Sequence, residues 1–237
     1  LTLIGDQVTD EDSDTTIVLS ASDVDIDENG QTLTYSAVSS DESLVTVSTT
    51  TEGNGTTGTL TFDVQDNQNG SSDITVTVND AQGRAVDSET FTLTVNAVND
   101  PVTLTVPIAD YSVDEDAAPT TVADLDTVFD DIDLTNGDPS VLQTLSYSVV
   151  SNSDPDLASA SIDGDGVLLV SYTGEHNGSA EITVGADDSN GSTLDESFTV
   201  TVNAVNDLPI LSAIGDQETM EDEDFSIDLS ASDIDIE

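Results

Sequence analysis

Carboxylates that return at fixed places in the chain are the residues with the clearest capacity for chemistry. They form an early acidic run, an Asp-x-Asp pair, an Asp before a late strand and an Asn-Asp that recurs between repeated segments. The runs are Asp10-Glu-Asp12, Asp114-Glu-Asp116 and Glu221-Asp-Glu-Asp224; the pairs are Asp23 with Asp25, Asp131 with Asp133 and Asp233 with Asp235; the others are Asp80, Asp188, Asn99-Asp100 and Asn206-Asp207. Clustered side-chain oxygens of this kind bind hard cations.

The charge balance requires cations around a compact chain. Its 237 residues include 50 Asp and Glu against one Lys or Arg, for a formal net charge of -49. Two carboxylates about 4 Å apart repel by roughly 4 kcal/mol at an effective dielectric of about 20. Calcium accepts about six to eight oxygens in irregular geometry, whereas zinc prefers nitrogen and sulfur and the chain has no Cys. Calcium (Ca2+) is therefore the predicted cofactor.

The same composition excludes several classes of function. One basic residue cannot form the basic patch that binds nucleic acid or an anionic membrane. The single histidine, His176, precedes Asn-Gly and gives little basis for a Ser-His-Asp triad. No apolar run approaches the roughly 20 residues that cross a bilayer. We predict no enzyme activity, no nucleic-acid partner and no direct membrane insertion of this segment.

Alternating apolar residues indicate the strands that must position the acids. Runs such as Ile74-Thr-Val-Thr-Val78 have the period of two that is typical of half-buried strands, which argues against an acidic disordered tail. The strand candidates of the first hundred residues are 2–5, 16–21, 32–37, 44–49, 58–63, 73–79 and 89–97. Short strands with a turn signal about every ten residues are typical of an antiparallel, immunoglobulin-like sandwich. The predicted fold class is all-β, and we expect no amphipathic helix.

Long sequence segments recur and divide the chain into repeats. Asn96-Ala-Val-Asn-Asp100 returns as Asn203-Ala-Val-Asn-Asp207, and Leu19-Ser-Ala-Ser-Asp23 returns as Leu229-Ser-Ala-Ser-Asp233. A unit of about a hundred residues corresponds to one sandwich. We predict repeat one at 1–100, repeat two at 101–207 and the start of a truncated repeat three at 208–237, joined end to end.

The direction of the strands decides which acidic sets can meet. We expect the early acidic run and the loop before the last strand to lie at the end of the sandwich where the chain leaves. We expect the Asp-x-Asp pair to lie at the end where the chain comes in. Acids of neighbouring repeats would then meet at each joint.

Taken together, these motifs resemble cadherin repeats. Segment 23–36 is similar to the cadherin stretch D-x-D-x-G-x-N-G-x-x-x-Y-S, and segment 74–100 to the A-x-D-x-G motif, last strand and D-x-N-D-N-x-P linker. The Asn-Ala-Val-Asn-Asp linker resembles the tandem repeats of large bacterial surface adhesins. The resemblance implies cadherin-like sandwiches with calcium held between them. It implies that Glu11, Asp80, Asn99, Asp100, Asp131 and Asp133 are ligands at the first joint, and Glu115, Asp188, Asn206, Asp207, Asp233 and Asp235 at the second, with Asp23 and Asp25 as the matching pair of repeat one.

The chain departs from the cadherin pattern in its linkers. Ala97 and Ala204 stand where cadherins have the first linker carboxylate, and Pro101 and Leu208 stand where they have the final Asn. Fewer charged ligands imply fewer ions at each joint or weaker binding than in animal cadherins.

Each acidic motif also has a plainer interpretation as a solvated loop. Adaptation to high salt would explain the charge, but it does not explain why acids return at the same loops. Asp25-Ile-Asp-Glu-Asn-Gly30 begins like an EF-hand loop, yet its twelfth position is Ser36 rather than Glu. A lectin-like module would hold calcium at an exposed loop instead of a joint.

The sequence thus predicts calcium-binding, extracellular adhesin or spacer repeats at the cell surface. Calcium would rigidify the joints, for cell adhesion or biofilm attachment. The predicted partners are calcium, neighbouring repeats of the same chain, and other cell-surface proteins or glycans. The alternative function is a calcium-dependent carbohydrate-binding module.

Overall fold

The structure, a computed structural model, describes residues 1–24, 26, 30–80, 86–134 and 144–235. The chain packs as two compact units. The first unit comprises residues 1–102 with segments 131–145 and 188–192, and the second comprises 103–130, 146–187 and 193–237. Asp25, one of the predicted ligands, lies outside the described residues. The repeat boundaries at residues 100 and 207 stay predictions.

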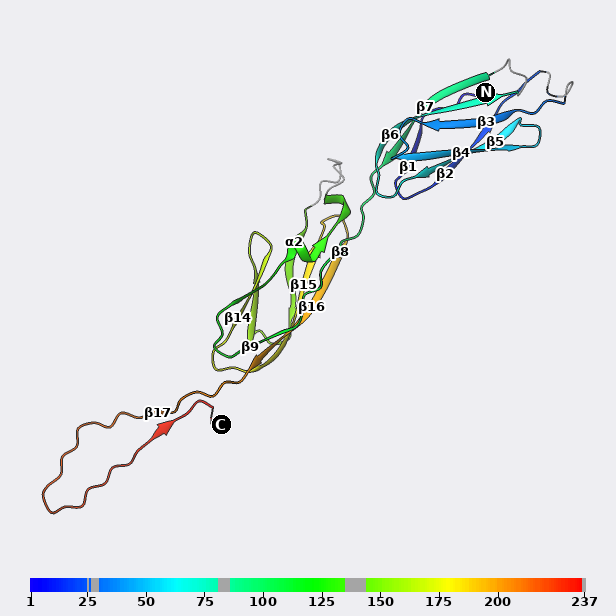
Figure 1. Cartoon of the computed structure of the whole chain (residues 1–237). Coiled ribbons are helices and arrows are strands. Elements are labelled where there is room, and N and C mark those ends of the chain that lie inside the picture. The colour runs from blue at the N-terminus through cyan, green and yellow to red at the C-terminus, as the bar shows by residue number, and fades with distance from the viewer. Residues whose placement is uncertain (25, 27–29, 81–85, 135–143, 236–237) are drawn as a thin grey trace. The chain divides into compact units, whose positions relative to one another are not determined.

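The first unit is a sandwich of two sheets (Figure 1). One sheet has the order β1-β7-β6-β3, formed by Gln7–Asp10, Val86–Asn96, Gly70–Asn79 and Thr34–Ser39. The other has the order β2-β5-β4, formed by Thr15–Ser20, Thr57–Val64 and Val45–Glu52. Strand β1 runs parallel to β7 and pairs Asp10 with Asn96. This pairing brings the residues after β1 to the place where β7 ends.

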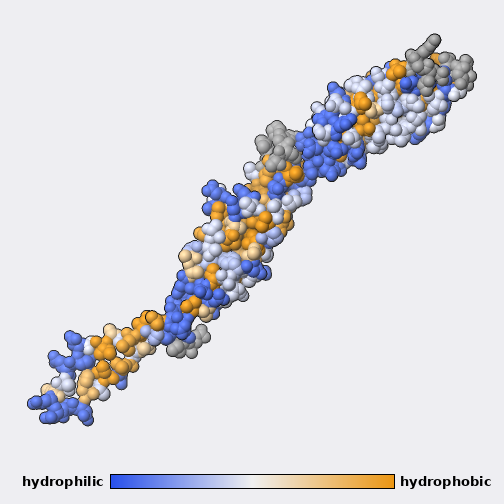
Figure 2. Space-filling model, viewed as in Figure 1, coloured by the Kyte–Doolittle hydropathy of each residue, from blue (hydrophilic) through white to orange (hydrophobic). Residues whose placement is uncertain are grey.

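Apolar side chains alternate along these strands and fill the space between the sheets. In β6, Ile74, Val76 and Val78 are buried, while the residues between them face outward. Phe62 of β5 and Phe91 of β7 meet edge to face with ring centroids 6.2 Å apart. Full burial of one such side chain contributes about 1.5–3 kcal/mol, so these contacts hold the two sheets together. Figure 2 shows pale residues over the strands and strongly hydrophilic ones gathered at one end of this unit.

The second unit repeats the same plan. One sheet has the order β12-β15-β16-β9, formed by Ser146–Asn152, Gly178–Asp187, Thr193–Asn203 and Tyr111–Asp114. The other has the order β10-β14-β13, formed by Thr120–Asp124, Val167–Tyr172 and Ala158–Ile162. Strand β9 is parallel to β16 and pairs Asp114 with Asn203. A short ladder joins β8 (Thr103–Leu104) to β11 (Phe129–Asp130).

Two details differ from the sequence predictions. The strand expected at 2–5 is absent from the described residues, and the first strand, β1, begins at Gln7. Among the elements that the structure describes in full, two short helical turns were not foreseen: α2 (Leu125–Val128), capped by the Asp124 side chain, and the 3-10 helix η1 (Ile132–Leu134). Each is too short for apolar periodicity to reveal it. Within the described part of the chain, no helix is long and apolar enough to span a membrane.

Residues 208–237 repeat a contact made at the start of the first unit. Strand β17 (Ile210–Leu211) pairs with β18 (Ala231–Ser232), and the Ser212 N–H donates to the Ser230 carbonyl at 2.9 Å. In the first unit the Thr2 N–H donates to the Ser20 carbonyl at 2.8 Å. The recurring sequence is therefore accompanied by a recurring backbone contact.

Candidate cation sites at the linkers

Three carboxylates of the first unit gather beside the linker that follows β7. One oxygen each from Glu11, Asp100 and Asp133 lies within 4.8 Å of the others, and we call these residues the first cluster. Glu11 follows β1, Asp100 belongs to the linker, and Asp133 lies in η1. Glu11 is 1% exposed and Asp133 4%, while Asp100 is half-buried. Three predicted ligands are thus brought together.

Backbone N–H groups orient these acids. The Val98 N–H donates to Glu11 Oε1 at 2.8 Å, and the Asp100 N–H donates to Asp133 Oδ2 at 2.7 Å. The Asp133 N–H in turn donates to Oδ1 of the buried Asp131 at 3.0 Å. Each of these bonds fixes one carboxylate oxygen and so directs the other oxygen of the same group.

Two carboxylate oxygens of the first cluster are buried without a hydrogen-bond partner. They are Glu11 Oε2 and Asp100 Oδ2. Leaving a charged acceptor unsatisfied in a protein interior costs more than the roughly 1–3 kcal/mol of a neutral group. Carboxylate oxygens are the donors that calcium prefers, so these residues fit a calcium ion.

The electrostatics of the first cluster favour a positive partner. Burial raises the pKa of Glu11, and the charges of Asp12, Asp100 and Asp133 raise it further against the opposing Val98 N–H. Burial also raises the pKa of Asp100, with Asp12, Asp133 and Asp131 adding to the effect. Ionisation of either group is therefore unfavourable in the absence of a cation. A proton or a metal ion at this place relieves the same repulsion.

The second unit has an equivalent group at the next linker. One oxygen each from Glu115, Asp207 and Asp235 lies within 4.8 Å of the others, and these residues form the second cluster. The hydrogen bonds repeat one by one. Val205 N–H donates to Glu115 Oε1 at 2.6 Å, Asp207 N–H to Asp235 Oδ2 at 2.6 Å and Asp235 N–H to Asp233 Oδ1 at 3.1 Å. The Asn206 side chain bonds to the Asp207 carbonyl, as Asn99 does to that of Asp100.

The second cluster has two further acids that the sequence analysis did not assign. Oxygens of Asp116 and Glu175 also lie within 4.8 Å of one of Asp207. The pKa of Glu175 is raised, first by partial desolvation and then by a hydrogen bond with Asp207. The charges of Asp207, Asp116 and Glu115 raise it further. Aligning Gly178 with Gly70 would have revealed the difference, because it places Glu175 where repeat one has Asn67.

Asp188 and Asp80 do not lie where the sequence analysis placed them. Asn99 of the first linker donates its side-chain N–H to Asp188 Oδ2 at 2.9 Å, so Asp188 adjoins the first linker instead of the second. Asp80 lines a small pocket with Asp23 rather than joining the first cluster. The reason is topological. Since β6 and β7 are antiparallel neighbours, the loop between them lies at the opposite end from the linker that leaves β7.

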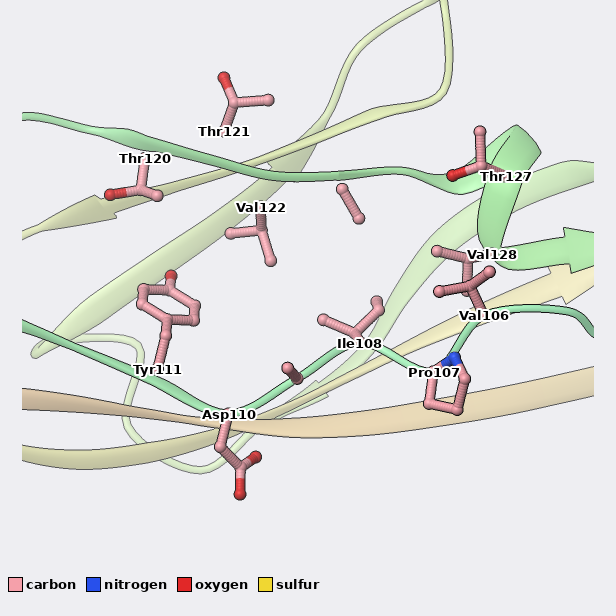
Figure 3. A pocket seen from close by; sticks show the side chains of 12 residues that line it. Val106, Pro107, Ile108, Asp110, Tyr111, Thr120, Thr121, Val122, Thr127 and Val128 are labelled. Carbon is pink, nitrogen blue, oxygen red and sulfur yellow. The ribbon is translucent and has the colours of Figure 1, made fainter.

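A separate groove of about 450 Å³ lies on the second unit, between residues 106–111 and 120–128. In Figure 3, Ile108, Tyr111 and Val122 point into the space between these two segments, whereas Asp110 points away from it. Asp110 Oδ1 instead accepts the Thr199 N–H at 2.6 Å. The acid among its described lining residues, Asp110, therefore does not point into the groove.

Two sandwiches of this topology have the fold of immunoglobulin-like and cadherin-like repeats. Residues 2–96 match the family model of the bacterial Ig domain. The predicted all-β fold and the resemblance to cadherin-like repeats are thus confirmed for the fold.

Solved structures extend the comparison to the whole chain. Human CDH23 EC21-23 is 17% identical, with 97% of this chain and 78% of that chain covered and a TM-score of 0.55. Protocadherin gammaB7 EC3-6, a cis-dimer structure, is 18% identical, with 98% and 58% covered and a TM-score of 0.53. The present chain thus spans little more than half of that protocadherin chain. At these identities the likeness concerns the fold. No curated protein matches the sequence.

Proposed function

We propose that the chain is an array of extracellular adhesin or spacer repeats whose linkers bind calcium and become rigid. Such repeats would stand at the cell surface and serve cell adhesion or biofilm attachment. Their partners would be neighbouring repeats and, beyond them, proteins or glycans of other surfaces. Ig-like and cadherin-like folds are used widely as extracellular spacers, which supports the assignment without fixing the ligand.

One observation carries the proposal. The first cluster contains two buried carboxylate oxygens, Glu11 Oε2 and Asp100 Oδ2, that have no hydrogen-bond partner. A stable fold does not ordinarily keep such atoms unless something absent from the polypeptide satisfies them. Calcium suits the site because its ligands are carboxylate oxygens of flexible number.

In this proposal the residues act by sharing one charge. Glu11 belongs to repeat one, Asp100 to the linker, and Asp133 to repeat two. When bound, calcium supplies the positive charge that these groups lack. The backbone N–H groups of Val98 and Asp100 hold two of the carboxylates in place. Bending the linker would then break several oxygen contacts together.

Small-angle scattering with and without calcium tests this function. At constant ionic strength, we expect a narrow distance distribution in millimolar calcium and a broader one after chelation. Matched ionic strength separates specific binding from general screening. Identical distributions, with circular dichroism showing folded strands in both conditions, would remove the role of calcium in stiffening. Calorimetry on the same samples would then show whether calcium still binds elsewhere.

A further inference from the structure

The second unit lacks a contact that closes the start of the first unit. In the first unit the Thr2 N–H donates to the Ser20 carbonyl at 2.8 Å. When the Ile-x-Asp motifs of the two repeats are aligned, Val106 and Asp124 stand at these two positions. The Val106 N–H donates instead to the Val128 carbonyl at 3.3 Å. The start of the second unit is therefore fastened at a different place.

The helical turn α2 accounts for this difference. Asp124 caps the turn, and its carbonyl accepts the Thr127 hydroxyl at 2.7 Å. The segment 106–110 is anchored at Val128 in α2 instead of at the end of β10. The groove between that segment and β10 has a volume of about 450 Å³, whereas the matching groove of the first unit has about 210 Å³.

The two walls of the larger groove are not hydrogen-bonded to each other. Strand β10 is at the edge of its sheet, and its bulged residue Val122 has no partner in β14. In the opposite wall, Pro107 has no N–H to donate. Within residues 106–124, all of which the structure describes, no hydrogen bond joins 106–110 to β10. An open strand edge of this kind is a template for a further strand.

The floor of the groove is apolar. Ile108 and Val128 are buried, and Figure 3 shows Ile108, Tyr111 and Val122 directed into the space. Successive side chains of a strand point to opposite faces, so an extended segment beside β10 would place every second side chain on this floor. The volume falls within the range of about 300–1,000 Å³ that is usual for ligand pockets.

The charge around the groove decides the kind of partner. Asp124 and Asp126 are exposed at one end of it. The whole chain has 50 acids against one Lys or Arg, so a second copy would bring further acids to this place and be repelled. A segment with basic residues beside its apolar positions is attracted instead.

We propose that the groove receives an extended segment of another protein, which adds a strand to the open edge of β10. The segment has apolar side chains at alternate positions and basic residues beside Asp124 and Asp126. About five residues match the length of β10. So short a segment buries less than the roughly 1,200 Å² of a stable interface, and the contact is therefore weak. This binding site is separate from the proposed calcium role and does not depend on it.

A synthetic peptide tests the site. The probe is Lys-Lys-Val-Thr-Val-Thr-Val, titrated into the full ¹⁵N-labelled chain in millimolar calcium. We expect the largest NMR shift changes at residues 106–111 and 120–128. Hydrogen exchange in β10 should slow on binding, because its open backbone groups become bonded. A scrambled peptide of the same composition, and one with Glu in place of both Lys, should bind about tenfold more weakly.

Val122→Gln tests the same site from the side of the chain. It places a larger, polar and uncharged side chain in the groove, and we expect peptide affinity to fall about tenfold. Val18→Gln, at the matching position of the first unit and 76% exposed, is the control and should leave affinity unchanged. Melting curves show whether both variants are folded, and the NMR map of the parent decides the site even if Val122→Gln is not.

Several results would overturn the proposal. They are equal binding of the scrambled or the acidic peptide, shift changes spread over acids away from the groove, and unchanged affinity in folded Val122→Gln. Self-association of the peptide-free chain that Val122→Gln abolishes would also overturn it, because a second copy would then occupy the groove.

Discussion

The loop before β6 and the loop before β15 each contain a residue with positive φ at the same place, but its side chain differs. Asn67 has a φ of +55° and Glu175 a φ of +60°. The Asn67 N–H donates to Asp12 Oδ1 at 2.8 Å, and the Glu175 N–H donates to Asp116 Oδ1 at 3.3 Å. Each loop is thus hydrogen-bonded to the early acidic run of its own repeat. One brings a neutral amide and the other a carboxylate.

The comparison distinguishes two properties of a linker site: the hydrogen bonds that orient its acids, and the number of acids it contains. The hydrogen bonds that orient the acids are the same in both clusters, so they belong to the repeated fold. The number of acids is not the same, since Glu175 gathers with Asp116 and Asp207 at the second linker, where repeat one has Asn67. A single position in one loop therefore sets how much positive charge a linker requires.

Among the changes proposed here, removing an aspartate from either cluster should have the largest effect on calcium affinity. We expect Asp133→Ala to weaken calcium binding at the first linker by about 100-fold and Asp235→Ala to do so only at the second. Asp133 is the more deeply buried of the two. Calorimetric titration of each variant, with the exposed Asp156→Ala as control, checks the result. Indistinguishable titrations of Asp133→Ala and Asp156→Ala would remove the assignment of the first site.

Exchanging the two loop residues should shift affinity in opposite directions. We expect Glu175→Asn to weaken calcium binding at the second linker by about tenfold and Asn67→Glu to strengthen it at the first by a similar factor. Asn67→Gln, which keeps the amide, is the matched control.

The same exchange should act differently in EDTA. There Glu175→Asn should raise the melting temperature, because it removes repulsion and Asn tolerates positive φ better than Glu. Melting curves in EDTA and in calcium check this change of sign. A lower melting temperature for Glu175→Asn in both conditions would mean that the glutamate is structural.

The smallest expected effect is the dependence of the first cluster on pH. The pKa values of Glu11 and Asp100 are raised in the fold, so their contribution to stability is present below the unfolded values of about 4 and is lost as pH rises through the folded values. Without calcium, stability should therefore fall as pH rises from about 4 toward neutrality. Glu11→Gln should flatten this change, measured by melting in EDTA. An unchanged pH profile would contradict the assigned repulsion.

Much of the architecture is predictable from the sequence because it depends on local pattern. Alternation along segments such as 73–79 and 89–97 identifies the strands, and the Asn-Ala-Val-Asn-Asp motif identifies the repeats. The resemblance to cadherin repeats implied the grouping of Glu11, Asp100 and Asp133. The position of Asp188 did not, because it depends on which end of an antiparallel hairpin a loop occupies. Glu175 was missed because a single acid in a turn does not stand out in so acidic a chain until the two repeats are aligned at Gly70 and Gly178.

The parallel pairing of β1 with β7 has a consequence for a chain that is pulled. Tension transmitted through residues before Gln7 and after Asn96 would act along these two neighbouring strands. The four pairs from Gln7 with Leu93 to Asp10 with Asn96 would be loaded in shear, all at once, instead of being opened one after another from an end. β9 and β16 have the same arrangement in the second unit. Each sandwich would therefore have to break several backbone pairs together before its terminal strand could separate.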